Sequence, residues 1–422
     1  MIQANEYAER RQRYLDQVEE NSLTILFSGV AKKSSYDEEY PFEVNRNFYY
    51  LTGIDQEDSI LLMLKSEGEK REYLFVSPYS ELKEKWYGKR LTTEEAYLIS
   101  GVRNVLLNSA LKARLDAILA SGNSPYGEIK HVYLDMEKEQ KIAEDIGAEQ
   151  EMEILEDAYD IVSFLDAYPI LVKQRLIKSP AEIAELKEAI ATTRLGVQAV
   201  MANAHPGVNE YELASTFRKV CDDDDGYQGL AFNTIMASGA NATTLHYPYP
   251  KARAEKGSLI LMDLGSRNHY YCADVSRTIP VSGCFSPEQK EIYEIVLGCN
   301  KAVASYARPG ISLGELNDFA KNYLASECLR IGLIKDKKEI DKYFYHSVSH
   351  QIGLDTHDPG GNKTDPLEIG NVISDEPGLY IKEKGIGIRI EDDLLITKNG
   401  AEVLTKDIIK EVADIEQFYQ IR

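Results

Sequence analysis

The sequence feature that most restricts the fold of this chain is a group of histidines and acids within residues 346–391. His346, His350 and His357 fall within twelve positions, and Glu376 and Glu391 follow in segments rich in glycine, proline and isoleucine. An apolar segment buries carboxylates only where hydrogen-bond donors or a cation compensate their charge. Histidine nitrogens and carboxylate oxygens are also ligands of divalent metals. The stretch therefore predicts a folded metal site rather than a solvated surface.

The chain is long enough for two domains, because 422 residues exceed what one ordinary hydrophobic core serves. Residues 1–172 contain short β-rich runs that alternate with helical patterns, which is typical of an α/β domain. Ser179 to Glu182 form a capping box with Pro180 at the first helical position, so a new helix is predicted to begin there. We therefore assign residues 1–172 to a first domain and residues 173–422 to a second.

The second domain contains a faint internal repeat. Ala204-His-Pro-Gly207 recurs 103 positions later as Ala307-Arg-Pro-Gly310, with matching residues on both sides. Each copy predicts a helix, a Pro-Gly turn and a second helix, followed by strands that carry candidate metal ligands. Chance similarity between two Pro-Gly turns is the alternative explanation. If the repeat is real, the metal site lies between two pseudo-symmetric halves.

Asp263 and Asp274 extend the candidate site upstream. Asp263 ends an apolar run, and a two-residue loop at 267–268 would close a hairpin that places it opposite Cys272. Asp274 would then be its diagonal neighbour on the same face, within about 7–8 Å. Two like charges so close repel each other unless a cation lies between them. A pair of solvated surface acids is the alternative.

The last two acids sit in extended segments. Glu376 precedes Pro377, which holds it in an extended conformation. Arg389 and Glu391 alternate with isoleucines, so the two share one strand face and Arg389 could orient the carboxylate. Four carboxylates and one imidazole then balance two divalent cations, and their chemistry favours Mn²⁺, Co²⁺ or Zn²⁺. The five candidate ligands are Asp263, Asp274, His350, Glu376 and Glu391.

In this order and in these local sequences, the five residues resemble the pita-bread metallopeptidases, which include methionine aminopeptidase, Xaa-Pro aminopeptidase (aminopeptidase P) and Xaa-Pro dipeptidase (prolidase). The proline-directed branch is the most similar, and the resemblance covers nearly the whole chain. It rests also on Leu245-His246-Tyr247, on the segments around the three clustered histidines, and on Ile388 to Asp393. Tyr40 to Gly53 is similar to the aminopeptidase P accessory domain, although Glu43 and Arg46-Asn47 depart from its usual residues.

The resemblance implies a fold and a set of roles. The fold is an α/β N-terminal domain of the creatinase/aminopeptidase P type, followed by an α+β pita-bread catalytic domain of the creatinase/methionine aminopeptidase type. Asp263 would chelate one metal ion, His350 and Glu376 the other, and Asp274 and Glu391 would bridge them. A hydroxide between the two metals, most simply Mn²⁺, would attack the carbonyl of an N-terminal Xaa-Pro bond.

The remaining roles implied by the resemblance concern the substrate. Glu376 would manage the proton, while His246 and His357 would stabilise the oxyanion and the departing proline nitrogen. His346 would line the proline pocket, and Arg389 completes the substrate-binding set with the three histidines. The expected function is an Xaa-Pro aminopeptidase. A prolidase restricted to dipeptides is the alternative, and a pita-bread peptide-binding module without catalysis is a remote one, because no ligand is missing.

The resemblance implies that the partners are peptides that carry proline at the second position, and composition argues against two other classes of partner. A net charge of −21 argues against nucleic-acid binding, and no apolar run approaches the roughly 20 residues that span a bilayer. The N-terminus lacks a secretory pattern, which favours the cytoplasm. Trp86 stands among charged residues and predicts a loop. The resemblance implies a homo-oligomer, a dimer or tetramer, in which the Trp86 loop reaches a neighbouring subunit's active site.

Overall fold

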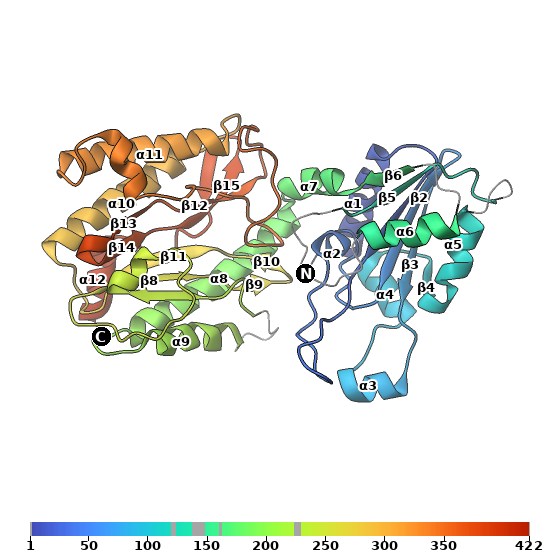
Figure 1. The fold of residues 1–422 in the computed structure, drawn as a ribbon, viewed down its shortest axis with the longest axis horizontal. Helices are drawn as coiled ribbons and strands as arrows, with labels where there is room; N and C mark the ends of the chain where they lie inside the picture. Colours follow the sequence, from blue (N-terminus) through green and yellow to red (C-terminus); the bar gives the residue numbers. More distant parts are fainter. Residues whose placement is uncertain (1, 120–123, 137–147, 160–162, 223–228, 422) are drawn as a thin grey trace. The chain divides into compact units, whose positions relative to one another are not determined.

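The computed structural model describes residues 2–119, 124–136, 148–159, 163–222 and 229–421 (Figure 1). The chain divides into two compact units, Ile2–Arg175 and Leu176–Arg422. Each unit has its own strands and helices.

The described strands of the first unit form a six-stranded mixed sheet in the order β4-β3-β2-β1-β5-β6. Strand β2 pairs antiparallel with both β1 and β3. The outer strands pair in parallel: β4 with β3, β5 with β1, and β6 with β5. Leucine, isoleucine, valine and aromatic side chains from the sheet form the core of this α/β unit. The strands are β1 (Ser22–Phe27), β2 (Ile60–Ser66), β3 (Glu69–Val76), β4 (Val105–Leu107), β5 (His131–Leu134) and β6 (Ser163–Asp166). The helices are α1 (Ala4–Gln17), α2 (Arg46–Thr52), α3 (Glu81–Tyr87), α4 (Thr93–Ser100), α5 (Leu111–Leu119), α6 (Ala148–Ala158) and α7 (Tyr168–Leu176).

Trp86 lies in the last turn of helix α3, so the prediction that it stands in a loop is wrong. Acidic residues in the first turn and Lys85 in the last turn complement the helix dipole, and Lys85 pairs with Glu81 one turn earlier at 2.6 Å. The charges that suggested a loop instead stabilise a short helix. The indole remains exposed, at 73%.

Three helices of the second unit begin at capping boxes. The Ser179–Glu182 capping box starts α8 with Pro180 in its first turn, which confirms the predicted helix start, and matching boxes start α10 and α11. Gly207 and Gly310 both have φ +91° in the turns between paired helices, so the predicted repeat of helix, Pro-Gly turn and helix is confirmed. The helices are α8 (Pro180–Asn203), α9 (Glu210–Asp222), α10 (Pro287–Tyr306), α11 (Leu313–Arg330) and α12 (Val412–Gln420).

The strands of the second unit lie between the helix pairs α8/α9 and α10/α11 (Figure 1). The described residues form two three-stranded antiparallel sheets, in the orders β11-β8-β7 and β12-β15-β16, and two short hairpins, β9-β10 and β13-β14. This layering brings the strands that carry the candidate ligands together. The strands are β7 (Ile235–Ser238), β8 (Leu259–Leu264), β9 (Arg267–Asn268), β10 (Tyr271–Cys272), β11 (Val275–Pro280), β12 (Val372–Asp375), β13 (Gly378–Ile381), β14 (Ile386–Arg389), β15 (Asp392–Thr397) and β16 (Gly400–Val403).

The hairpin that carries Asp263 and Asp274 has a different register from the predicted one. Its turn is formed by His269 and Tyr270, which both have positive φ, while residues 267–268 belong to strand β9. Asp263 consequently lies opposite Ser276, and the prediction that it faces Cys272 is wrong. Because Asp274 is two residues from Ser276, it nevertheless remains a diagonal neighbour of Asp263 on the same face.

Candidate metal centre

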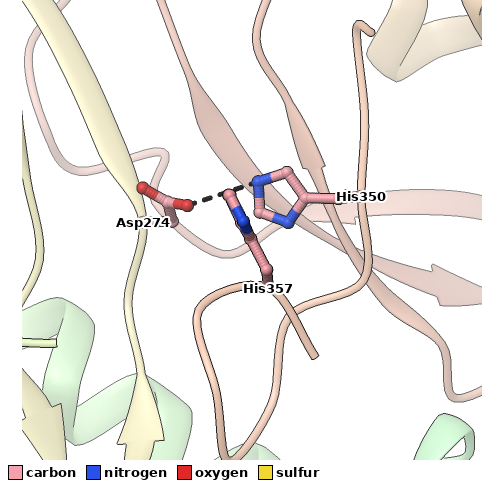
Figure 2. A group of neighbouring side chains, drawn as sticks. All are labelled: Asp274, His350 and His357. Atoms are coloured by element: carbon pink, nitrogen blue, oxygen red, sulfur yellow. Dashed lines mark ion pairs between the residues drawn. The ribbon is translucent and has the colours of Figure 1, made fainter. Parts of the chain in front are cut away.

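The structure brings the five predicted metal ligands together. Their ligand atoms form two groups, each within 4.8 Å: Asp263, Asp274 and Glu391, and His350, Glu376 and Glu391. Glu391 belongs to both groups, which is the position of a residue that could contact two ions. A third such group joins Asp274, His350 and His357 (Figure 2).

His350 contacts two carboxylates of the cluster. Its Nε2 lies 3.4 Å from Asp274 Oδ2 and 3.4 Å from Glu376 Oε1, and Figure 2 shows the contact with Asp274. Its Nδ1 lies 3.0 Å from the Gln351 carbonyl oxygen, which accepts a hydrogen bond when Nδ1 carries the proton. That tautomer leaves the Nε2 lone pair free to bind a metal. The Ser374 hydroxyl accepts the His350 backbone N–H at 2.9 Å and holds the segment in place.

Arg389 connects two other candidate ligands, Asp263 and Glu391. Its guanidinium donates to Asp263 Oδ2 at 2.7 Å, to the Ser276 hydroxyl at 2.7 Å and to the Tyr380 hydroxyl at 2.9 Å. Ser276 in turn donates to Glu391 Oε2 at 2.8 Å. Arg389 is buried and orients two of the carboxylates; its predicted contact with substrate remains a prediction.

Burial makes Asp274, Glu376 and Glu391 hard to ionise in the absence of a cation. Burial, followed by repulsion from neighbouring acids, raises the pKa of Asp274 to about 6 and that of Glu376 to about 7. Burial raises the pKa of Glu391 well above its ordinary value. For His350 burial acts in the opposite direction, but Asp274 and Glu376 outweigh it and raise the pKa to about 9. The protonated imidazole partly compensates a site that has excess negative charge.

The donor set fits divalent metal ions. Asp263 Oδ1 is buried and accepts no hydrogen bond within the described ranges, although its sister oxygen is held by Arg389. A buried carboxylate oxygen without a donor is costly, and a cation in the cluster would satisfy it. Oxygen ligands with one imidazole suit Mn²⁺, Co²⁺ and Zn²⁺. Asp263, Asp274, His350, Glu376 and Glu391 are the residues that would hold such ions.

The other three predicted histidines surround the cluster. His346 Nε2 lies 2.8 Å from the Tyr380 hydroxyl, and burial lowers its pKa to about 4. His357 is an exposed residue, but its ring packs edge-on against His350 with centroids 4.3 Å apart. Desolvation of that ring and the charges of His350 and His246 lower its pKa to about 4. His246 lies in the turn after residues 239–243, and its charge also lowers the pKa of His346.

Several residues that support the site were absent from the sequence analysis. Ser276 and Tyr380 connect Arg389 to Glu391 and to His346. Arg277 donates to the Glu391 carbonyl oxygen at 2.5 Å and to Asp392 Oδ1 at 2.9 Å, which anchors the end of the Glu391 segment. The alternation of side chains in an extended segment could have indicated Ser276, because it lies two residues after Asp274 and therefore on the same face. The contacts of Arg277 link distant segments and have no local signature.

None of the described helices is both long enough and apolar enough to cross a bilayer.

Two protein-family models match the chain. The model described as metallopeptidase family M24 matches residues 184–398, and the model described as the aminopeptidase P N-terminal domain matches residues 7–126. The Xaa-Pro aminopeptidase of Haemophilus influenzae is 35% identical, over 97% of this chain and 96% of that protein.

Solved structures match over the full length. A structure from Bacillus anthracis, assigned as an aminopeptidase P, is 41% identical with a TM-score of 0.95, and covers 100% of this chain and 99% of that one. Zinc-substituted aminopeptidase P of Escherichia coli, in complex with product, is 31% identical with a TM-score of 0.91 and the same coverage.

The fold and the site together define a metallopeptidase built from an α/β N-terminal unit and a pita-bread unit, which confirms the predicted fold class. The chain belongs to metallopeptidase family M24. With its N-terminal unit of the aminopeptidase P type, it is a metallo-aminopeptidase.

Proposed function

We propose that the enzyme removes the N-terminal residue from peptides that carry proline at the second position, by means of two divalent metal ions. The observation that carries the proposal is the cluster of five ligands in two groups that share Glu391. Relatives named Xaa-Pro aminopeptidase that align with nearly the whole chain support the choice of substrate.

Two divalent ions, when bound, polarise the scissile carbonyl and lower the pKa of water so that it attacks at neutral pH. The enzyme's own residues prepare the site for this chemistry. Arg389 holds Asp263 and, through Ser276, Glu391, so that both carboxylates are oriented before an ion arrives. Glu376 lies 3.4 Å from His350 Nε2 within the cluster, and we assign to it the transfer of the proton that the attacking water gives up.

The histidines act on the substrate. With pKa values lowered to about 4, His346 and His357 are neutral at pH 7. His357 can donate one hydrogen bond to substrate, whereas the single N–H of His346 is directed at the Ser347 carbonyl oxygen, 2.8 Å from Nδ1. We assign His357 and His246 to the developing oxyanion and the departing proline nitrogen. His346, fixed by Tyr380, lines the pocket for the proline ring.

Mn²⁺ is the proposed native metal, because carboxylates predominate among the ligands. A zinc-substituted structure is known for the E. coli relative, so Zn²⁺ and Co²⁺ are competing ions to be tested beside Mn²⁺. We also propose a homo-oligomer in which Trp86 lies at an interface, and its exposed indole supports this assignment.

Paired substrates test the proposal. EDTA-stripped enzyme is given an Xaa-Pro dipeptide or an Xaa-Pro-Yaa tripeptide, each with and without Mn²⁺, and an Xaa-Ala-Yaa tripeptide serves as the control. We expect Mn²⁺-dependent cleavage of the proline tripeptide. The dipeptide should be cleaved more slowly or not at all. Activity confined to the dipeptide would instead identify a prolidase, and no cleavage with metal bound would favour a binding module.

A further inference from the structure

A buried ion pair lies beside the segment that carries His357. Lys178 Nζ is 3.1 Å from Asp358 Oδ2, and both side chains are only 1% exposed. Lys178 immediately precedes the capping serine of α8, and its backbone N–H donates to the Gly370 carbonyl oxygen at 2.9 Å. The lysine is therefore held at both ends, by its backbone N–H and by its ammonium at Asp358.

Asp358 closes the turn on which His357 stands. Its Oδ1 accepts the Asp355 backbone N–H at 3.2 Å, and its own N–H donates to the Gln351 carbonyl oxygen at 3.0 Å. One carboxylate oxygen thus contacts the lysine and the other contacts the start of the turn. His357 is the residue between these anchor points, and its ring reaches His350 (Figure 2).

The close packing of the turn leaves Asp358 little freedom. A Cβ added at Gly353 would lie 2.4 Å from Asp358 Oδ2, so the carboxylate fills the space that a side chain there would need. The Gly353 carbonyl oxygen accepts the Cys272 N–H at 2.8 Å, which ties the turn to the hairpin that carries Asp274. A displacement of Asp358 would therefore move His357 relative to the metal ligands.

Stability alone does not account for a charged pair at this place. Two desolvated charges gain little over well-packed apolar side chains, so a buried pair is weak evidence for a stabilising role. Its directional contacts, however, fix the geometry of the groups that it joins. The side chain with most to gain from that geometry is His357, which lies next to Asp358 and points into the cluster.

We propose that Lys178 is a positioning residue for His357 and acts through Asp358. The inference rests on the proposed function, because it assigns His357 a place at the reacting carbonyl. Displacement of a catalytic group by about 1 Å costs up to about a hundredfold in rate. Loss of the lysine should therefore lower kcat and leave the metal content and KM almost unchanged.

A double-mutant cycle separates positioning from general damage to the fold. Lys178→Met, His357→Ala and the double variant are compared with wild type for Mn²⁺-dependent tripeptide cleavage. We expect Lys178→Met to lower kcat about tenfold or more in wild type, but less than about twofold in the His357→Ala background. The proposal would be overturned if Lys178→Met lowered kcat equally in both backgrounds, or if it left kcat unchanged when His357 is present.

A second readout does not depend on activity. In metal-free protein labelled with ¹⁵N-histidine, the His357 imidazole signal is identified by its loss in His357→Ala. We expect this signal to shift in Lys178→Met and to stay in place in Lys187→Met, whose exposed pair with Glu402 is the matched control. An unmoved signal would contradict the positioning of His357 by Lys178, whatever the substrate is. Failure to cleave the tripeptide would contradict only the proposed function.

Removal of the Lys178 charge beside the buried Asp358 carboxylate in Lys178→Met could prevent folding. Lys178→Met combined with Asp358→Asn removes both charges of this ion pair together. The same cycle with His357→Ala and the same NMR signal then apply to this pair. A neutral pair that restores wild-type kcat and signal position would show that the ionic contact does not position His357.

Discussion

Asp274 is a carboxylate that the metal-free fold holds at a cost. Burial raises its pKa to about 6, and Asp263 adds repulsion from the same face of the hairpin. The neighbouring His350 proton relieves part of this repulsion. Two bound cations would relieve the rest, so the site is arranged for charges that the polypeptide does not supply itself.

Asp274→Ala should remove a shared ligand while preserving the fold. We expect the metal content to fall by at least one ion per chain and kcat/KM to fall by more than about a hundredfold, beyond the usual effect of an outer-shell residue. The melting temperature of the metal-free variant should be equal to or above that of wild type, since a buried charge is lost. Metal analysis and tripeptide hydrolysis measure this, with exposed Asp318→Ala as the control; full turnover in Asp274→Ala would refute the ligand assignment.

Metal affinity should rise with pH between about 6 and 9. Protons occupy Asp274 and Glu376 below pKa values of about 6 and 7, and His350 keeps its proton up to a pKa of about 9. Each proton must leave before the atom binds an ion, so falling pH weakens binding. Calorimetry of Mn²⁺ binding in buffers of different ionisation enthalpy measures the protons released. An affinity that stays constant from pH 6 to pH 9 would disprove this account.

The β8–β11 hairpin places both aspartates, and its geometry depends on a glycine. Gly265 lies between Asp263 and the turn, and a Cβ there would be 1.9 Å from the Ala273 carbonyl oxygen. Backbone cannot move away as a flexible side chain does. The segment just before Asp274 would therefore have to shift.

Gly265→Ala should destabilise the protein by about 3 kcal/mol or more and weaken metal binding, because overpacking displaces the strand that carries Asp274. Chemical denaturation of the metal-free protein and Mn²⁺ titration measure the two effects. Gly360→Ala is the control, since its nearest neighbour is the flexible Gln351 side chain at 3.2 Å. Equal stability of the two variants would show that the hairpin accommodates the methyl group.

Local sequence signals predicted the elements better than their pairing. The capping box at Ser179 fixed the start of α8, because its hydrogen bonds lie within four residues. The hairpin register was wrong, because Asn268 is a better turn residue than His269 or Tyr270 on local grounds alone. Tertiary packing of the hairpin overrode that preference.

The candidate site could be predicted largely because its ligands sit in distinctive local sequences. The diagonal relation of Asp263 and Asp274 followed from the hairpin and survived the register error, whereas their grouping with His350, Glu376 and Glu391 was implied by the family resemblance. Arg277 and Lys178 could not be found in this way. Their partners lie more than a hundred residues away and are brought near only by the completed fold.

Assembly of several chains is the remaining expectation about the molecule. Trp86 lies on α3 with an exposed indole, and Leu82 on the same helix is 67% exposed. Exposed aromatic and aliphatic side chains on one short helix favour burial in an interface.

Sedimentation velocity should therefore find a dimer or tetramer, and Trp86→Ala should shift the distribution toward monomer and lower activity. Lys85→Ala on the same helix is the control for loss of helix stability. A tight, fully active wild-type monomer would exclude the assignment of Trp86 to an interface near a neighbouring active site.

The most direct measurement of the central claim is a titration of EDTA-stripped enzyme with Mn²⁺, in which bound metal and Xaa-Pro-Yaa hydrolysis are recorded on the same samples. Two ions bound by the cluster of five ligands predict that activity rises with metal and reaches its plateau at two ions per chain. Full activity in stripped enzyme, or a plateau at one ion with no further gain, would contradict a dinuclear site.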